Sequence, residues 1–173
     1  MRYLTLIRHA KSSWRDTALE DFDRPLSPRG DRDAPEMGEA FARRYLRPGK
    51  LPPPDTLVSS PACRAITTAR AIAERIDYPA DAIAEEPAVY EADTDRLLRV
   101  VRQLPAPATH AVLFGHNPAF ESLARKLAPD FTGDGKKFPT CGIAMLRLAI
   151  DDWAQTEGGV ADAHDFLCPK RLT

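Results

Sequence analysis

A positively charged side chain and an imidazole stand together after the first apolar run of the chain. Residues 3–7 read Tyr-Leu-Thr-Leu-Ile, a short β-branched and aromatic run that is typical of a buried strand, and Arg8 and His9 follow it directly. In open α/β sheets, ligands gather where loops leave the carboxyl ends of the strands. Arg8 and His9 at such an edge would suit an anion such as phosphate, although a solvated arginine beside a loop histidine would give the same dipeptide.

Two later segments place the same kinds of side chain after an expected strand. Arg64 lies in the first turn of a helix expected to open at Ser60-Pro61, where free N–H groups and the helix dipole favour anions. His116 follows the apolar run 110–114. Taken alone, each would be an ordinary helix or loop residue. If the three strands are neighbours, however, two arginines and two histidines converge on one small volume.

Hydrophobic periodicity and turn signals predict that strands and helices alternate along the chain. The expected strands cover residues 3–7, 56–59, 82–85, 110–114, 143–150 and 160–167. Three expected helices open on a polar N-cap followed by proline, at Ser27-Pro28, Ser60-Pro61 and Asn117-Pro118, and a further one spans 97–104. This order predicts an α/β three-layer sandwich, with a mostly parallel central sheet and helices on both faces. The short link 151–159 predicts an antiparallel edge near the C-terminus, and a single domain, 1–173, accounts for the chain.

Length and composition fit one globular domain and exclude several classes of function. The 173 residues are 43% apolar and 28% charged, and their formal net charge is −1. A nearly neutral chain argues against a surface built for nucleic acid or anionic lipid, and no apolar run reaches the ~20 residues of a membrane span. Because the first expected strand begins almost at Met1, no signal peptide is expected, and the expected location is the cytoplasm.

Neither the cysteines nor the histidines have the spacing of a metal site. Cys63, Cys141 and Cys168 form no CxxC pair, so they are expected to be small hydrophobic residues of the interior. The four histidines include no HxxxH or HExxH pair. His110, at a strand entrance, and His164, in a late strand, are expected to be structural. The chemistry is therefore expected to need no metal and no cofactor.

Three motifs, each placed after an expected strand, are similar to those of a known family. Residues 6–14 (LIRHAKSSW) resemble the opening motif of the histidine phosphatase superfamily, the phosphoglycerate-mutase-like proteins. Residues 59–61 (SSP) with Arg64, Thr67 and Ala69 resemble its second motif, and residues 115–118 (GHNP) its third. Residues 24–26 (RPL), 29–30 (RG) and 169–172 (PKRL) are most similar to the small bacterial phosphohistidine phosphatases. The resemblance runs nearly end to end.

This resemblance implies a two-step hydrolysis through a phosphorylated enzyme. The imidazole of His9 would attack phosphorus and form a phosphohistidine intermediate, which water then hydrolyses. Attack requires a neutral ring, and cations nearby would lower its pKa. Arg8 and Arg64 would hold phosphoryl oxygens with their planar guanidinium groups, and His116, if protonated, would add a donor. All four residues are thus candidate catalytic residues, and Arg8, Arg64 and His116 are also candidate substrate ligands.

The proton donor for the leaving group is the least defined part of the expected site. Many superfamily members use a carboxylate between the second helix and the next, where this chain has residues 90–93 (YEAD). Glu91 is the candidate acid, although it would fit an exposed loop charge equally well. Asp93 is expected instead at the N-terminus of the third helix.

Two positions depart from superfamily members that act on small phosphate esters. Those members often carry Gly after the nucleophilic histidine and Asn soon after the tryptophan, whereas this chain has Ala10 and Arg15. Arg15, Lys11 or Ser13 could replace the missing Asn contact, and Ser13 is the substrate-binding candidate.

The expected function is that of a metal-independent phosphatase acting on phosphohistidine of a protein. Imidazole, with a pKa of ~6.5, is readily protonated as it leaves, so it needs less help from an acid than an alcohol does. No segment is long enough for a separate cap over the site, which suits a phosphoryl group presented by another protein. The alternative is a phosphatase of small phosphate esters or nucleotides, and a second alternative is a phosphoprotein-binding module without turnover. Nucleic acid and membrane are not expected partners, and the oligomeric state is left open.

Overall fold

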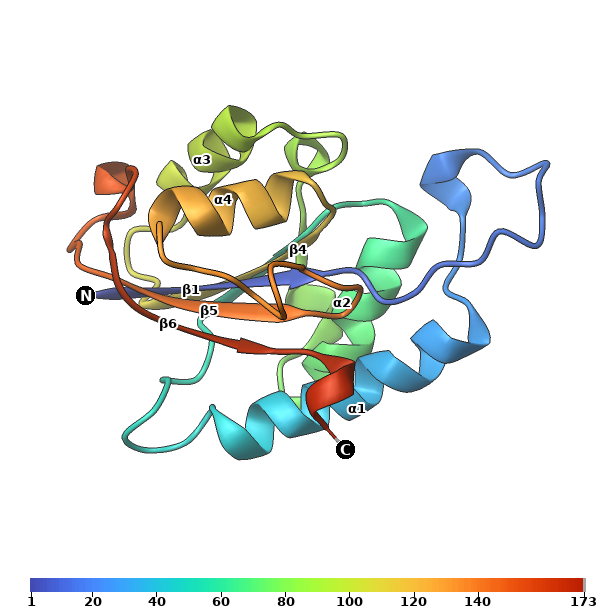
Figure 1. Ribbon diagram of the computed structural model, residues 1–173, viewed down its shortest axis with the longest axis horizontal. Coiled ribbons are helices and arrows are strands. Elements are labelled where there is room, and N and C mark those ends of the chain that lie inside the picture. Colours follow the sequence, from blue (N-terminus) through green and yellow to red (C-terminus); the bar gives the residue numbers. More distant parts are fainter. Residues whose placement is uncertain (173) are drawn as a thin grey trace.

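The computed structural model describes residues 1–172, which contain one six-stranded sheet (Figure 1). The strands are β1 (Arg2–Arg8), β2 (Thr56–Ser59), β3 (Ala84–Glu85), β4 (His110–Gly115), β5 (Ile143–Leu148) and β6 (Ala161–Leu167). Their order is β3-β2-β4-β1-β5-β6; the first four are parallel to one another, and β5 is antiparallel to both of its neighbours. The predicted mostly parallel sheet with an antiparallel edge near the C-terminus is confirmed.

Helices cover both faces of this sheet, because alternate side chains of each strand point to opposite sides. Helices α1 (Pro28–Arg44) and α2 (Cys63–Arg75) lie on one face, and α3 (Thr94–Arg102) and α4 (Ala119–Leu127) lie on the other (Figure 1). On β1, Leu6 packs into the core with α3 and α4, whereas its neighbour Ile7 packs into the core with α1 and α2. The predicted three-layer sandwich is confirmed. No helix within residues 1–172 is long and apolar enough to cross a membrane.

Local capping signals explain where α1 and α3 begin. Ser27 Oγ accepts a hydrogen bond from the Gly30 N–H (3.2 Å), and Pro28 occupies the first helical position, where a missing N–H costs nothing. Asp93 Oδ1 accepts a hydrogen bond from the Arg96 N–H (2.8 Å). The predicted start of α1 and the predicted place of Asp93 at a helix N-terminus are confirmed.

Helix α2 begins later than the sequence predicts. Its first residue is Cys63, and Ala62 instead of Ser60 occupies the N-cap. The Ser60 N–H donates to the Phe114 carbonyl (2.9 Å), which extends the pairing of β2 with β4 by one residue. Ser60 is therefore held at the sheet edge and cannot cap the helix.

Helix α4 also begins later than predicted. It starts at Ala119, and Pro118, predicted as the first helical residue, occupies the N-cap. Asn117 still reaches the first turn, because its Oδ1 accepts a hydrogen bond from the Glu121 N–H (3.3 Å). The turn after β4 is thus one residue longer than expected.

The order of the strands brings the three motif-bearing loops to one edge of the sheet. Strand β4 lies between β2 and β1, and Gly115 at its end pairs with Arg8 at the end of β1. The three strands run parallel, so their loops leave the sheet on the same side. These loops lead to His9, to Arg64 and to His116. The three strands are therefore neighbours, as the convergence of these residues requires.

Candidate active site

The ring of His9 is held in one orientation and one tautomer. Its backbone N–H donates to the Gly115 carbonyl (2.9 Å), and its Nδ1 lies 2.7 Å from the carbonyl oxygen of Ala10. Because a carbonyl oxygen can only accept, Nδ1 carries the ring proton and Nε2 keeps a free lone pair. His9 is only 7% exposed. Nε2 is therefore the atom available for nucleophilic attack.

The surroundings of His9 keep its ring neutral. Burial lowers the pKa of His9 to about 4; the hydrogen bond to Ala10 opposes this change, and the charges of Arg64, Arg8 and Arg24 reinforce it. At pH 7 the ring is therefore uncharged, as an attacking imidazole must be. The same arginines would stabilise the negative charge of a phosphoryl group attached to it.

His116 lies beside His9 and is neutral as well. The centroids of the two rings are 5.3 Å apart. Burial, followed by the charges of Arg64 and His9, lowers the pKa of His116 to about 3. The sequence analysis expected a protonated His116 ring to donate a hydrogen bond. At pH 7 the ring is instead neutral, and its one N–H is the donor.

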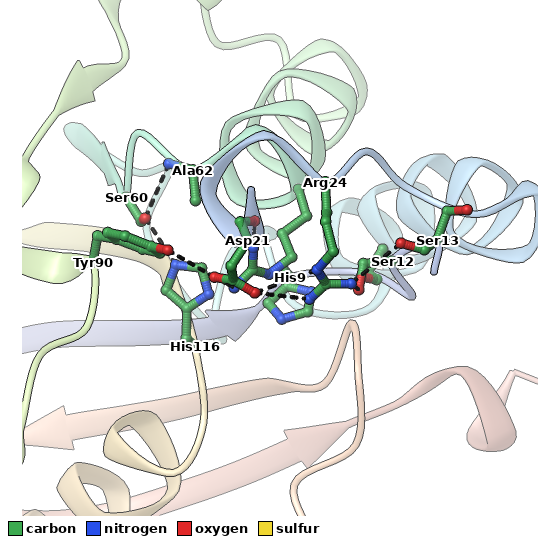
Figure 2. Close-up of polar contacts among 11 residues, drawn as sticks. His9, Ser12, Ser13, Asp21, Arg24, Ser60, Ala62, Tyr90 and His116 are labelled. Carbon is green, nitrogen blue, oxygen red and sulfur yellow. Dashed lines mark hydrogen bonds and ion pairs between the residues drawn. The ribbon is translucent and has the colours of Figure 1, made fainter. Parts of the chain in front are cut away.

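Ser60 is the hydrogen-bond partner of His116 Nε2. Its Oγ accepts a hydrogen bond from the Ala62 N–H (3.2 Å) and lies 2.8 Å from His116 Nε2 (Figure 2). When the hydroxyl proton is donated to Nε2, the ring proton is on Nδ1. Within residues 1–172, Nδ1 is buried and has no hydrogen-bond partner. An anion bound there would accept this N–H.

Arg8, which is half-buried, and Arg64, which is buried, both have unused N–H groups. Arg8 Nη1 donates to the Phe138 carbonyl (2.9 Å). Arg64, in the first turn of α2, donates from Nη1 to the Asp21 carbonyl (2.7 Å) and from Nη2 to Asp21 Oδ2 (3.0 Å). The Nε atoms of both arginines are buried without a partner in the described part of the chain. Because unpaired buried donors are costly, these N–H groups mark a place where an anion binds favourably.

Arg24 is a residue of the site that the sequence argument missed. It is 7% exposed and donates from Nη1 to Ser12 Oγ (2.7 Å; Figure 2). Its guanidinium carbon lies 3.6 Å from the ring centroid of Trp14. Its charge contributes to the low pKa of His9. The sequence contained one signal for Arg24, because residues 24–26 (Arg-Pro-Leu) are similar to the small bacterial phosphohistidine phosphatases. That similarity assigned no role to the arginine.

Asp21 and Tyr90 were also missed, and they form a polar cluster with the arginines. Asp21 lies in a single-turn 3-10 helix, η1 (Asp21–Asp23), and its Oδ1 accepts from Arg24 Nε (3.3 Å) and Nη2 (3.2 Å). Its Oδ2 accepts from the Tyr90 hydroxyl (2.7 Å) as well as from Arg64. Burial tends to raise the pKa of Asp21, but hydrogen bonds from Tyr90 and Arg64 outweigh it and bring the pKa to about 2. Burial and the bond to Asp21 raise the pKa of Tyr90 to about 12.

The side chains of the remaining two candidates of the sequence analysis make no hydrogen bond to His9 or His116 within residues 1–172. Glu91 is exposed and adjoins Tyr90, and its side chain makes no hydrogen bond or ion pair with any residue from 1 to 172. Ser13 Oγ accepts a hydrogen bond from the Arg15 N–H (3.2 Å) and so faces its own turn. The structure thus gathers His9, His116 and the arginines; the Ser13 carbonyl accepts a hydrogen bond from Arg24 Nη1 (3.3 Å), and the charge of Glu91 acts on Tyr90.

Residues outside the site have the surroundings of structural groups. His110 is buried, with Nδ1 donating to the Pro52 carbonyl (2.8 Å) and Nε2 accepting from the Thr5 hydroxyl (2.9 Å). Cys141 and Cys168 are buried, and Cys63 is half-buried. Residues 1–172 contain no group of three His, Cys, Asp or Glu side chains arranged to hold a metal ion.

The fold and this cluster agree with the family of known proteins to which the chain is similar. The chain belongs to the histidine phosphatase superfamily (branch 1), whose family model matches residues 4–97. An uncharacterized protein of Mycobacterium tuberculosis (strain H37Rv) is 36% identical over 171 residues, covering 95% of this chain and all of that protein. An uncharacterized chloroplastic protein of Arabidopsis thaliana is 29% identical over 162 residues, covering 89% of this chain and 70% of that protein.

Solved structures with the same fold include SixA proteins. The SixA protein of Agrobacterium tumefaciens, which carries the name of a phosphohistidine phosphatase, has a TM-score of 0.76 at 26% identity, covering 97% of this chain and 98% of that one. The protein histidine phosphatase SixA complexed with tungstate has a TM-score of 0.77 with 99% of both chains covered; at 19% identity it bears on the fold alone. The family and the similarity to the Agrobacterium tumefaciens protein support phosphatase activity for this chain.

Proposed function

We propose that this protein is a metal-independent phosphatase that removes the phosphoryl group from phosphohistidine on other proteins. The observation that carries the proposal is the environment of His9: a neutral ring, a proton fixed on Nδ1 by Ala10, and a free Nε2 among Arg8, Arg24 and Arg64. A binding module without turnover has no use for a nucleophile prepared in this way. The proposal places the protein in the cytoplasm and gives it no cofactor.

The reaction follows from these groups in two balanced steps. In the first, the Nε2 lone pair of His9 forms a bond to phosphorus, the bond from phosphorus to the substrate imidazole breaks, and that imidazole takes up a proton from solvent water. In the second, water forms a bond to phosphorus, His9 leaves with its lone pair on Nε2, and inorganic phosphate is released. Arg8, Arg64 and the Nδ1–H of His116 stabilise the charge on the phosphoryl oxygens in both steps.

The ionised state of Asp21, the carboxyl group of the cluster, favours phosphohistidine over an ester as the substrate. An alcohol leaving group requires a positioned acid, whereas imidazole, with a pKa of ~6.5, accepts a proton near neutral pH. Asp21, with a pKa of about 2, holds no proton to give at pH 7. Glu91, the candidate acid from the sequence, is exposed and makes no side-chain hydrogen bond within residues 1–172, although its charge acts on the neighbouring Tyr90 of the cluster.

The rim of the site favours a protein as the carrier of the phosphoryl group. Trp14 (68% exposed), Leu19 (39%) and Phe22 (39%) belong to the few large hydrophobic side chains exposed within residues 1–172. All three come from the segment 10–27, which also supplies Asp21 and Arg24 to the site. Exposed aromatic and aliphatic groups beside a polar pocket are typical of a protein-binding surface.

The experiment that tests this proposal looks for a phosphoryl group on His9. The protein is mixed with a histidine-phosphorylated protein, quenched in alkaline denaturant, and analysed by mass spectrometry of its peptides. We expect transient phosphorylation of His9, absent in His9→Ala, and unchanged turnover in the presence of a chelator. Values of kcat/KM for the phosphohistidine protein and for a panel of small phosphate esters and nucleotides then define the substrate class.

Three results would contradict the proposal. A higher kcat/KM for any small ester or nucleotide would establish the alternative class of substrate. Binding of the phosphoprotein without release of phosphate would establish the binding module. Loss of turnover with chelator, restored by a divalent cation, would overturn metal independence.

A further inference from the structure

Asp21 places a carboxylate on the guanidinium groups that a phosphoryl group would need. Both terminal nitrogens of Arg64 donate to Asp21, one to its backbone oxygen (2.7 Å) and one to Oδ2 (3.0 Å). Arg24 donates two further hydrogen bonds to Oδ1. Figure 2 shows Asp21 linked to Tyr90 on one side and to Arg24 on the other, with His9 and His116 next to the cluster.

A phosphoryl group bound at His9 and the Asp21 carboxylate would compete for the same donors. Both are anions, and two like charges a few ångströms apart in a partly buried site repel each other strongly. The carboxylate offers two oxygens and one negative charge, whereas a phosphoryl group offers three oxygens and up to two charges. Binding of the phosphoryl group therefore favours displacement of Asp21 from Arg64 and Arg24.

The segment that carries Asp21 is able to move without loss of core packing. The helix η1 has three residues, none of them buried. The Asp21 side chain is 49% exposed, in contrast to its partners Arg24 and Arg64, which are each 8% exposed. Outside the arginines, η1 is held by the Tyr90 hydroxyl on Asp21 and by an edge-to-face contact of Phe22 with the Tyr90 ring (centroids 5.2 Å apart).

We propose that Asp21 is a specificity-determining residue: an internal anion that occupies Arg24 and Arg64 until a phosphoryl dianion displaces it. This inference rests on the proposed function for the identity of the ligand. The apparent affinity for phosphate is reduced by the fraction of molecules in which Asp21 is displaced. Inorganic phosphate, the product, is the ligand most affected, because no protein contacts add to its binding, and its release is favoured when Asp21 returns.

The test compares inorganic phosphate binding to the full chain and to two variants that lose the same charge. Asp21→Asn removes the competing anion, and Asp23→Asn removes an exposed carboxylate from the same three-residue helix. By isothermal titration calorimetry, we expect the dissociation constant of phosphate to fall about tenfold or more in Asp21→Asn, as for a competitor that occupies nine-tenths of the molecules. In Asp23→Asn it should remain at the value of the unaltered chain. Thermal unfolding of each variant checks that it is folded. Asp21→Ala is measured as well, as a second substitution that removes the Asp21 carboxylate.

Two outcomes overturn the inference. Equal tightening in both asparagine variants would mean that long-range charge, and not occupation of the arginines, limits phosphate binding. Unchanged or weaker binding in both Asp21→Asn and Asp21→Ala would mean that Asp21 holds the arginines in place for the ligand. Binding is measured without turnover, so this result is independent of the search for phosphorylated His9, and either proposal can fail while the other stands.

Discussion

At the scale of single residues, one carbonyl group and one hydroxyl group define the chemistry of the two site histidines. The Ala10 carbonyl fixes the proton of His9 on Nδ1, and the Ser60 hydroxyl occupies Nε2 of His116. Burial then keeps both rings neutral, with pKa values of about 4 and about 3. With the Ser60 hydroxyl donating to Nε2 of His116, the His9 ring offers a lone pair and the His116 ring offers a proton at the same pH. This division of roles does not depend on a protonated imidazole.

The role of Glu91 is tested by its conversion to glutamine. We expect Glu91→Gln to leave kcat/KM for the phosphohistidine protein within about twofold, as for an exposed side chain without partners. A small phosphate ester should lose more, up to ~10²-fold, since its alcohol depends on any available acid. Steady-state kinetics on both substrates measure the ratio, with Glu85→Gln, another exposed glutamate, as the control. Equal losses on both substrates would contradict the argument from the leaving group.

The sequence predicted the site residues that directly follow strands and missed those delivered by an irregular loop. Arg8, His9 and His116 could be placed because a strand end has a defined position in a parallel sheet. Arg24 and Asp21 come from the polar stretch 11–24, in which no periodicity indicates which side chains turn inward. The placement of Asp21 depends on contacts with Arg64 and Tyr90, which are 43 and 69 residues away in the chain, and Arg24 in turn donates to Asp21. Such long-range contacts leave no local pattern.

At the scale of elements, the end of β4 is a closely packed support of the site. Gly115 is followed by His116, and its carbonyl accepts the backbone N–H of His9. A Cβ added at Gly115 would lie 2.6 Å from the Phe120 ring and 2.8 Å from Val89 Cγ1. The backbone can approach these side chains only because residue 115 has none. Both histidines are thus positioned by one closely packed residue.

Substitution at Gly115 should therefore affect stability and activity together. We expect Gly115→Ala to lower the free energy of unfolding by about 1–3 kcal/mol, the usual cost of overpacking, and to reduce kcat by displacing His116. Gly158→Ala is the control, because its Cβ would come no closer than 3.5 Å to another atom. Urea unfolding and steady-state kinetics measure both quantities. Gly115→Ala with the stability of Gly158→Ala would show that the site tolerates a side chain there.

Element starts were predictable where the signal was local and the helix end lay away from the site. Ser27 caps α1 as its sequence indicates. Ser60 and Asn117 carry the same signal but stand at the sheet edge, where Ser60 bonds to β4 and to His116 and Asn117 donates to the Phe138 carbonyl (3.0 Å). Tertiary contacts at the site therefore override the capping preference.

At the scale of the whole molecule, the sheet buries three of the four histidines in uncharged form. His110 lies within the sheet, and burial lowers its pKa to about 4; His9 and His116 lie at the sheet edge with pKa values of about 4 and about 3. In the unfolded chain each titrates near ~6.5. Between those values the unfolded chain binds more protons than the folded one.

Stability should consequently fall as the pH falls through this window. A group whose pKa is lowered by folding opposes folding once the unfolded form becomes protonated, so the loss begins near pH ~6.5 and continues to about 4. Each histidine contributes a slope of about 1.4 kcal/mol per pH unit. Urea unfolding across this range measures how steeply the free energy of unfolding changes with pH. His110→Gln should reduce this slope by the contribution of one titrating histidine. An unchanged slope in His110→Gln would show that His110 does not contribute.

The stacking of Arg24 on Trp14 gives the native chain an optical reporter at the entrance of its site. The sequence has two tryptophans, and the other, Trp153, is fully buried with its indole N–H on the Ala108 carbonyl (2.9 Å). Trp153 contributes a constant background, whereas the emission of Trp14 depends on the cation lying 3.6 Å from its ring. Any ligand that moves this arginine alters the fluorescence of an unlabelled protein, so anion entry can be followed on the millisecond scale of a stopped-flow instrument.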